Sequence, residues 1–370
     1  MLDTVILQIP IDYSAIIDHS RFTPSTKGII DISANFFKCT NNPKKADRES
    51  GLYKPKLTII KRAKKIYLKI EFSAPKLLSG NNLNEVEESD FEEIASKLRK
   101  TIEEMGVRLW TFEIEKAEVL GFHPSKNIPL TKGYTSSFAI KELSKINLNQ
   151  KFDLEKVSFR NDGEALQLYS NRHSFVLYDK INDLNKPAKR AIDKDQTKQQ
   201  IDLFEYIKRE KRNLEVLKLE VRLSSKTKMI EVLEEVGFID TPQFKNIFKK
   251  DLCQKIIKLY WDAFFGKNLF LFSVNNNPQR ILQMILIRYP KTNMRTAVML
   301  VGLYQLCKDE GIRGFRSIAK NYKPKFNWIR LRNYLRKFED EIFTKPAHGF
   351  IKDIEKAINE FKVFKLDNET

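Results

Sequence analysis

Residues 164–180 read EALQLYSNRHSFVLYDK, which is two short runs of alternating side chains joined by a polar turn. Strict alternation places Leu166 and Leu168 on one face of the first run, with Gln167 and Tyr169 on the other. We therefore expect a β-hairpin in which Tyr169 ends the first strand beside the turn. A tyrosine in that position can be presented to a phosphodiester.

The segments around this hairpin follow one order twice. We expect strand, strand, helix and strand over residues 56–61, 66–72, 89–105 and 108–120, and again over 165–169, 175–180, 196–212 and 214–223. An opening strand over residues 2–9 precedes both units. Antiparallel strands combined with helices predict an α+β fold. Here the antiparallel sheet would consist of two pseudo-repeated strand–strand–helix–strand units.

From Thr241 onward the pattern changes to helices. Helical spacing of apolar residues extends over 243–266, 278–288 and 294–310, and Gly311 is expected to end the last of these. Residues 313–322 and 328–342 then predict a helix–turn–helix. These expectations divide the chain into a domain of residues 1–240 and an all-helical C-terminal domain of residues 241–370.

The charge of the chain favours a polyanionic partner. It has 370 residues with 66 Lys and Arg against 48 Asp and Glu, a net charge of +18. Residues 241–370 hold 25 basic and 12 acidic side chains, and so carry about 13 of the 18 positive charges. Nucleic acid is the first candidate partner and an anionic membrane surface the second.

The predicted helix–turn–helix is the most basic part of the chain. Between Gly311 and Phe338 there are nine basic residues and no acidic one, and Asn327 is a candidate N-cap for the second helix. Such a helix can enter a DNA groove or follow phosphates. The alternative is an ordinary solvated helical bundle. The candidate DNA-binding residues are Arg316, Lys320, Lys325, Arg330, Arg332 and Arg336.

Cysteine usage and hydropathy indicate the compartment. Cys39, Cys253 and Cys307 form an odd, scattered set, which argues against a disulfide framework and against a thiolate zinc site. The first residues lack the features of a signal peptide, and no apolar run reaches about 18 residues. We expect a cytoplasmic protein of a reducing compartment that does not enter a membrane.

Two strand carboxylates are candidate metal ligands. Glu118 ends the predicted strand 108–120, and Glu220 lies between apolar neighbours on the last strand of the second unit. If a pseudo-twofold relates the units, the two carboxylates meet and can bind Mg²⁺ or Mn²⁺, which prefer oxygen ligands. The alternative is that both are solvent-facing charges paired with Lys116 and Arg222.

Tyrosine is the candidate nucleophile. A phenolate can attack a phosphodiester and form a phosphotyrosyl link that keeps the bond energy. Its ordinary pKa of about 10 means that it needs a metal, a base or a cation nearby. Arg172 and Lys180 can supply positive charge to Tyr169, and Tyr178 on the facing strand is the rival nucleophile. No two histidines are spaced as a metal motif, so we expect no His-based metal site.

Several stretches together resemble a known family. They lie in this order along residues 1–235, and the most distinctive is the Ser-x-Pro-Lys segment followed by Gly-Asn-Asn. The matching stretches are residues 2–10 (LDTVILQIP), 68–82 (LKIEFSAPKLLSGNN), 116–118 (KAE), 169–172 (YSNR), 178–180 (YDK) and 219–223 (LEVRL). The chain resembles the filamentous-phage gene II/X replication proteins and the related rolling-circle plasmid replication initiators.

The resemblance implies an endonuclease that nicks one DNA strand at an origin and rejoins it through a phosphotyrosine. On that basis Tyr169 is the nucleophile, and Arg172 and Lys180 contact the scissile phosphate. The implied ligands for Mg²⁺ or Mn²⁺ are Glu118 and Glu220, with Asp3 or Glu71. The implied partners are origin DNA and a host helicase and polymerase. The chain departs from the family in having Glu118 where relatives often show Asp, and in having no His-hydrophobic-His motif.

A second hypothesis comes from another functional class. The chain could be a non-enzymatic origin-binding or regulatory protein that keeps the fold and the basic helices. Both hypotheses predict salt-sensitive DNA binding. Only the enzyme predicts a covalent adduct between the protein and a DNA end.

Overall fold

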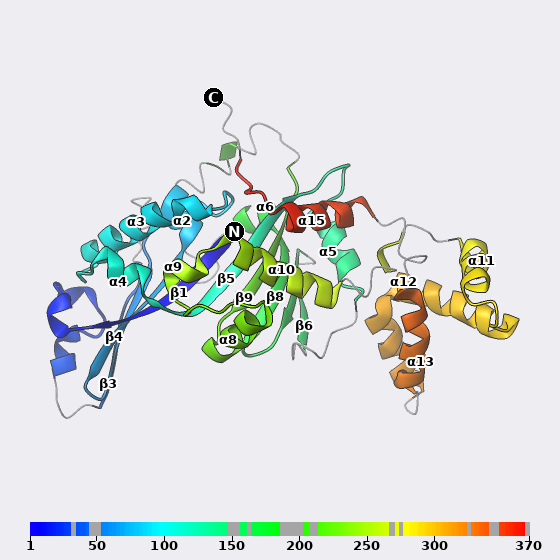
Figure 1. The fold of residues 1–370 in the computed structure, drawn as a ribbon, viewed down its shortest axis with the longest axis horizontal. Helices are drawn as coiled ribbons and strands as arrows, with labels where there is room; N and C mark the ends of the chain where they lie inside the picture. The colour runs from blue at the N-terminus through cyan, green and yellow to red at the C-terminus, as the bar shows by residue number, and fades with distance from the viewer. Residues whose placement is uncertain are drawn as a thin grey trace.

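The computed structural model describes residues 1–30, 35–43, 53–146, 156–160, 164–185, 203, 205–206, 214–265, 271–273, 277–323, 327–339 and 348–366. Within them the chain forms an α+β fold around one antiparallel sheet of nine strands (Figure 1), in the order β2-β3-β4-β1-β5-β9-β8-β7-β6. No helix in the described part of the chain combines the length and the apolar character needed to cross a bilayer.

Six of the nine strands follow predicted segments, whereas β2 and β6 were not predicted and β5 begins later than expected. In chain order they are β1 (Leu2–Ile11), β2 (Phe36–Asn41), β3 (Lys56–Arg62), β4 (Lys65–Ser73), β5 (Glu118–Pro129), β6 (Lys156–Arg160), β7 (Ala165–Tyr169), β8 (His173–Asp179) and β9 (Val216–Leu223). The opening strand, the β3–β4 hairpin and the last strand are therefore confirmed.

The hairpin of β7 and β8 is confirmed as well. Tyr169 pairs with Ser174 next to the turn, which the Ser170 amide closes by donating to the carbonyl of His173 at 3.0 Å. Tyr178 pairs instead with Ala165, at the far end of the hairpin. The two tyrosines thus lie on facing strands and share a face of the sheet. They do not pair with each other across the turn.

The strand–strand–helix–strand order occurs twice along the chain, but the two units differ within the sheet. Strand β1 lies between β4 and β5 and is antiparallel to both, so β4 and β5 run parallel. In the second unit β8 and β9 are direct antiparallel neighbours. A pseudo-twofold repeat is therefore not confirmed. The predicted helix over 196–212 lies almost entirely outside the described residues.

The helices of the first 240 residues are α2 (Ala74–Ser79), α3 (Phe91–Glu104), α4 (Thr111–Glu115), α5 (Ser136–Leu143), α6 (Lys180–Asn185) and α8 (Lys226–Glu235). Short 3-10 helices occupy Tyr13–Ala15, His19–Arg21, Thr26–Ile30, Glu88–Asp90 and Arg336–Glu339. Helix α2 follows β4 directly. The predicted strand over 108–120 is wrong in its first part. The Glu113 carboxylate accepts a hydrogen bond from the Trp110 amide at 2.7 Å, a cap that begins α4, so β5 starts only at Glu118.

The later helices are α9 (Phe244–Ile247), α10 (Lys250–Phe264), α11 (Pro278–Arg288), α12 (Met294–Tyr322), α13 (Trp328–Leu335) and α15 (Gly349–Glu360). Helices α9, α10 and α15 pack against β5, whereas α11, α12 and α13 lie to one side (Figure 1). The predicted boundary at residue 240 therefore does not separate the sheet from all of the helices that follow it.

Gly311 interrupts α12 as the sequence predicts. Its φ of 75° is left-handed, and a Cβ at this position would come within 2.8 Å of the Lys145 backbone. The next residue, Ile312, donates its amide to the carbonyl of Lys145 at 3.0 Å. Only glycine fits this contact without strain, so the bend is fixed by both conformation and space.

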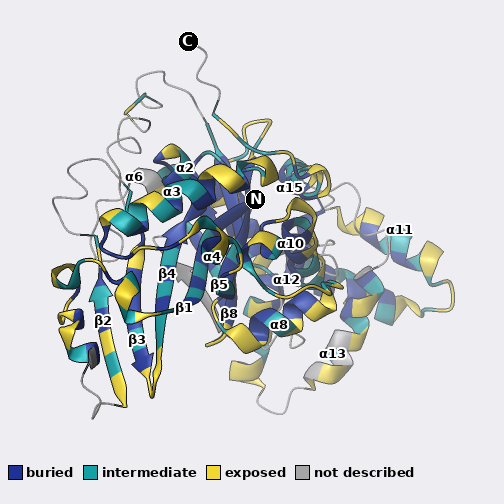
Figure 2. Cartoon of the chain, turned by 60° about the vertical axis from the view of Figure 1, so that its left-hand side comes forward, coloured by how far each residue is buried: buried dark blue, intermediate teal, exposed yellow. Residues whose placement is uncertain are grey.

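One face of the sheet is apolar and the other polar in the middle of the molecule. On β9 the residues Leu217, Leu219 and Val221 enter the main hydrophobic core, so Lys218 and Glu220 point to the opposite face. Buried residues are concentrated around the middle of the sheet and α10, while the lower ends of β2 and β3 are exposed (Figure 2). The polar face is nevertheless buried at its centre, and the candidate site lies there.

Candidate active site

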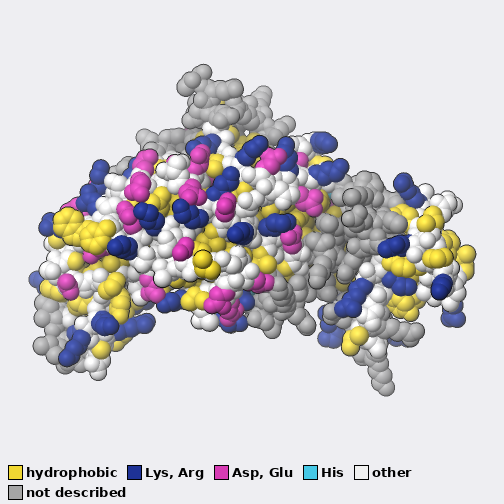
Figure 3. Space-filling model, in the orientation of Figure 1, with side chains coloured by type: hydrophobic (Ala, Val, Ile, Leu, Met, Phe, Trp, Pro, Cys, Tyr) yellow, Lys and Arg dark blue, Asp and Glu magenta, His cyan; other side chains and the backbone are white. Residues whose placement is uncertain are grey.

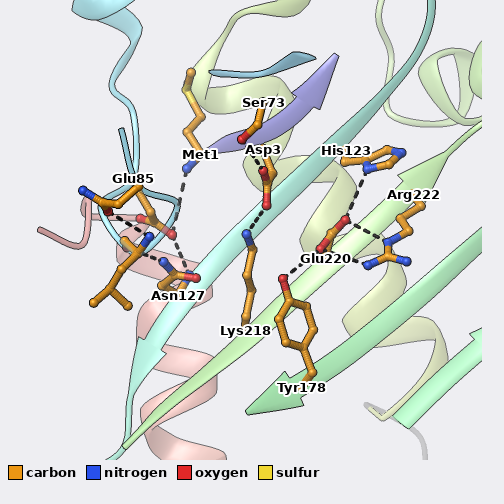
Figure 4. A network of polar contacts seen from close by, with 12 residues as sticks. Met1, Asp3, Ser73, Glu85, His123, Asn127, Tyr178, Lys218, Glu220 and Arg222 are labelled. Atoms are coloured by element: carbon orange, nitrogen blue, oxygen red, sulfur yellow. Dashed lines mark hydrogen bonds and ion pairs between the residues drawn. The ribbon is translucent and has the colours of Figure 1, made fainter. Parts of the chain in front are cut away.

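A cluster of polar side chains occupies the centre of the polar face (Figure 4). Its members come from five different strands, and most of them are buried. They are Asp3 on β1, Ser73 on β4, His123 on β5, Tyr178 on β8, and Lys218, Glu220 and Arg222 on β9. We call this set the polar cluster.

Glu220 lies in the middle of the polar cluster and is held by three partners. Tyr178 donates its hydroxyl to Oε2 of Glu220 at 3.2 Å, and Arg222 donates Nε to Oε1 at 2.8 Å. His123 Nδ1 lies 3.2 Å from Oε1. Because Glu220 is only 3% exposed, these groups replace the water that would otherwise solvate its charge.

These contacts set the protonation of the cluster. Burial works to raise the pKa of Glu220, but Arg222, His123 and Lys218 together outweigh it and hold that pKa well below its ordinary value. Burial, reinforced by the Glu220 carboxylate, raises the pKa of Tyr178 well above its ordinary value. Tyr178 therefore stays a neutral phenol that donates to an ionised carboxylate.

Asp3 and Lys218 form a second buried ion pair beside Glu220. The Lys218 ammonium donates to Oδ2 of Asp3, and the Ser73 hydroxyl donates to Oδ1 at 3.0 Å. Burial opposes the charge on both groups, yet Lys218 lowers the pKa of Asp3 and Asp3 raises the pKa of Lys218. Both remain ionised, so the two pairs place carboxylates and cations side by side.

The Lys180 side chain is buried near the polar cluster. It is 0% exposed, and its Nζ has no hydrogen-bond partner among the described residues. That Nζ lies 5.7 Å from the centre of the Tyr178 ring. Burial, reinforced by the charge of Lys218, lowers the pKa of Lys180 to about 7. Such an amine can accept or release a proton near neutral pH.

Tyr169 stands at the accessible edge of this face. It is half-buried, and it shares a cross-strand row with Ser174 and Arg222. The Arg222 side chain is 37% exposed, in contrast to Glu220. Two strand spacings separate Tyr169 from Arg222, roughly 10 Å between Cα atoms, a gap that two long side chains on the same face can bridge.

Arg172 and His173 turn away from the polar cluster. Arg172 lies 3.6 Å from Glu231 on α8, with both side chains largely exposed. His173 is buried, with Nδ1 2.6 Å from the Tyr260 hydroxyl on α10. Arg172 is therefore not brought together with Lys180, and His173 is not the surface histidine that its place beside a turn suggests.

The predicted carboxylate ligands separate into two groups. Asp3 and Glu220 lie within the polar cluster. Glu118 pairs with Lys226 and accepts from Gln8 at 3.3 Å, and it lies seven residues, roughly 20 Å, along β5 from the partner of Glu220. Glu71 is half-buried, two residues before Ser73 on the same face of β4. The expected meeting of Glu118 and Glu220 is therefore wrong.

The residues present do not fit the predicted Mg²⁺ or Mn²⁺ site. The oxygens of Asp3 and Glu220 are engaged by Lys218 and Arg222. No group of three or more His, Cys, Asp or Glu among the described residues is placed to hold a metal ion. Dependence on Mg²⁺ or Mn²⁺ stays a prediction.

The basic helices can be described only in part. Arg316 and Lys320 are exposed on α12, and Arg336 is exposed after α13. Lys325 and the side chains of Arg330 and Arg332 lie outside the described residues. On the face seen in Figure 3, basic side chains mark α11 to α13, whereas acidic ones lie over the sheet and its helices. A helix–turn–helix geometry is not confirmed.

No protein-family model, curated protein or solved structure matches this chain.

Three members of the polar cluster, Ser73, His123 and Lys218, were not predicted as site residues. The four histidines have no metal-motif spacing, and Lys218 has the pattern of an ordinary alternating strand charge. Their roles depend on which strands pair and in which register, which local sequence does not specify. The one signal in the sequence was the pattern of β9, in which charged residues alternate with apolar neighbours.

Proposed function

We propose that the chain is a DNA strand-transfer enzyme that nicks and rejoins one strand through a phosphotyrosine, as rolling-circle initiators do. One observation carries the proposal. Four stretches chosen from the sequence alone meet in one buried cluster, although they lie up to about 220 residues apart. They supply Asp3, Ser73, Tyr178 with the adjacent Lys180, and Glu220 with Arg222.

Tyr169 is the better nucleophile of the two tyrosines in this proposal. Tyr178 is buried, and its raised pKa disfavours the phenolate. Tyr169 is half-buried beside the turn and on the same face as Arg222. A phosphodiester can therefore approach Tyr169 from solvent while the Arg222 guanidinium faces the phosphate oxygens. Tyr178 is a positioning residue that holds Glu220, which in turn orients Arg222.

The proposed step exchanges one ester for another. The Tyr169 oxygen attacks phosphorus as its proton leaves, and the bond from phosphorus to the 3′ oxygen breaks. The 3′ oxygen takes up a proton, so no oxidant or reductant is required. Arg222 stabilises the charge that develops on the phosphate. The reverse attack by a 3′ hydroxyl rejoins the strand.

The test is nicking of supercoiled plasmid that carries candidate origin sequence, with Mg²⁺ or Mn²⁺ supplied and then chelated. We expect nicked DNA with protein attached to a 5′ end. Tyr169→Phe should abolish the adduct, because no other group replaces the nucleophile. Tyr178→Phe should retain the adduct at a rate reduced by about 10-fold or more, because Glu220 loses one of its partners.

Loss of the adduct in Tyr178→Phe together with full activity in Tyr169→Phe would assign the nucleophile to Tyr178. Salt-sensitive binding of origin DNA without any adduct would instead support the non-enzymatic regulator. The observation that keeps this second candidate in view is the exposed basic surface of α12, which needs no chemistry to bind DNA.

A further inference from the structure

A groove lies at the far end of β1 from the polar cluster. Its volume is about 720 Å³. It is lined by the end of β1, the following 3-10 turn, the β3–β4 turn and the segment that leads into α4, and the lining residues used below are Tyr13, Lys64, Lys65, Tyr67, Arg108 and Trp110. Asp3 lies seven residues from Pro10 on β1, so groove and cluster are roughly 20 Å apart.

Three aromatic rings line this groove. Trp110 is 67% exposed, an unusual state for the largest side chain. Its backbone is fixed at the start of α4, because the Trp110 amide donates to Glu113. Tyr13 and Tyr67 are half-buried in the same groove, and Tyr13 stacks on His19 with ring centres 4.9 Å apart. The rings are therefore held on rigid backbone, while the indole face of Trp110 stays open.

Basic side chains accompany the rings. Lys64 and Lys65 are exposed at the β3–β4 turn, and Arg108 is exposed on the opposite wall. Arg108 is partly neutralised by Glu103 at 3.4 Å, and the Glu113 carboxylate is engaged by the Trp110 amide. Hydrophobic and basic side chains lie next to each other over the end of the molecule that carries α3 and α4 (Figure 3).

The groove reaches the face of the sheet that carries the polar cluster. Pro10 pairs with Tyr67 on β4, and Thr4 pairs with Ser73 six residues further along the same strand. Both pairs therefore point to the same side, because side chains alternate along a strand. Half-buried Lys69 lies between Tyr67 and Ser73 on that face.

We propose that this groove binds single-stranded nucleic acid, with bases stacked on Trp110 and the two tyrosines and phosphates facing Lys64, Lys65 and Arg108. Open aromatic faces beside cations are the chemistry that single-strand binding uses, since every base offers a face for stacking. A duplex does not offer such faces, because its bases are already stacked on one another. The inference deepens the proposed function, but it rests on groove residues that the nicking step does not use.

The test is titration of the full chain with fluorescein-labelled oligothymidine, read by anisotropy and by quenching of tryptophan emission. Trp110→Ala should weaken binding by about 5- to 100-fold, the range measured for loss of one stacked base. Trp110→Phe should keep most of the affinity and lose the part of the quench that Trp110 contributes. A Lys64→Glu, Lys65→Glu variant should weaken binding and reduce its salt dependence.

The matched controls are Ile239→Ala, which truncates a side chain that is 95% exposed elsewhere, and Lys100→Glu, which reverses an exposed charge on α3. Both should bind like the parent chain. Equal affinity for Trp110→Ala and the parent would overturn the proposal, as would a quench of unchanged size in Trp110→Phe. Groove variants that lose oligothymidine binding while Tyr169→Phe retains it would separate this inference from the nicking proposal.

Discussion

At the scale of single residues, Lys180 is held in the environment least suited to its charge. It is fully buried without a hydrogen-bond partner among the described residues, and its pKa falls from 10.5 to about 7. Between these two values the folded chain binds fewer protons than the unfolded chain, so stability rises with pH across that window. Below about pH 7 the cost of burying the ammonium is fully present.

We therefore expect Lys180→Met to stabilise the fold. The free energy of unfolding should rise by up to about 4 kcal/mol near pH 6, and the gain should shrink toward pH 10. Urea denaturation at both pH values measures it, and Lys100→Met provides an exposed lysine as control. An equal gain at both pH values would show that packing, not charge, is responsible. A stabilised variant that no longer nicks DNA would be consistent with a lysine kept for function.

Residue-scale reasoning also shows what sequence can predict of a site. Asp3, Lys180 and Glu220 were chosen from the sequence, and all three lie at or beside the polar cluster. Glu118 was chosen by assuming a twofold between the units, and it lies elsewhere. His123 was not chosen, because only the pairing of β5 with β9 brings it to Glu220. Lys218 was not chosen, because its partner Asp3 lies on β1, 215 residues earlier in the chain.

At the scale of elements, sequence patterns predict those helices and strands whose formation depends on neighbouring residues. Alternation identified β7 and β8, and apolar spacing identified α3, whose Phe91, Ile94 and Leu98 are buried as expected. The sequence did not predict helix α4, because residues 108–120 alternate like a strand. The contact that begins the helix, from the Trp110 amide to the Glu113 carboxylate, lies within one turn of that stretch. The place of β1 between β4 and β5 was not predictable, since it depends on contacts between distant segments.

Helix α12 carries the element-scale prediction. Arg316 and Lys320 are exposed four residues apart, and so lie on one face of the helix. Arg316→Glu with Lys320→Glu should weaken duplex DNA binding and lower the slope of log K against log salt by about 2, if each side chain neutralises one phosphate. Filter binding at several salt concentrations measures the slope. Lys352→Glu on α15 is the control, and an unchanged slope would count against α12 as a DNA contact.

At the scale of the whole molecule, a second buried network ties distant segments together (Figure 4). Glu85 accepts hydrogen bonds from Lys126 Nζ at 2.6 Å and from the Phe364 amide at 2.9 Å. The Met1 amino group lies 3.9 Å from the same carboxylate. Burial works to raise the pKa of Glu85, but the Met1 amine and Lys126 hold it below its ordinary value. Its contribution to stability is thus present above about pH 4.5 and is lost as pH falls further.

We expect Glu85→Ala to lower the free energy of unfolding by about 3–5 kcal/mol, because it leaves Lys126 buried without a counter-charge. Asp262→Ala is the matched control, since it removes a surface pair with Lys258 and should cost no more than about 1 kcal/mol. Chemical denaturation at neutral pH distinguishes the two. A similar loss of unfolding free energy in both variants would show that the buried network stabilises the fold no more than a surface ion pair does.

The contact between Glu85 and Phe364 also bears on the order in which parts of the protein can fold during synthesis. These residues are 279 positions apart, and β5 must pair with β9 nearly 100 residues later in the chain. Residues 1–129 therefore leave the ribosome well before several of their partners exist: one edge of the central strand β5 is still unpaired, and Glu85 has Lys126 but not yet the Phe364 amide. A fold in which early segments pair with segments far later in the chain forms slowly, and here the contacts of the N-terminal half are complete only when the last segments are present. During synthesis, chaperone capture of the nascent first half should persist until residues near 364 emerge.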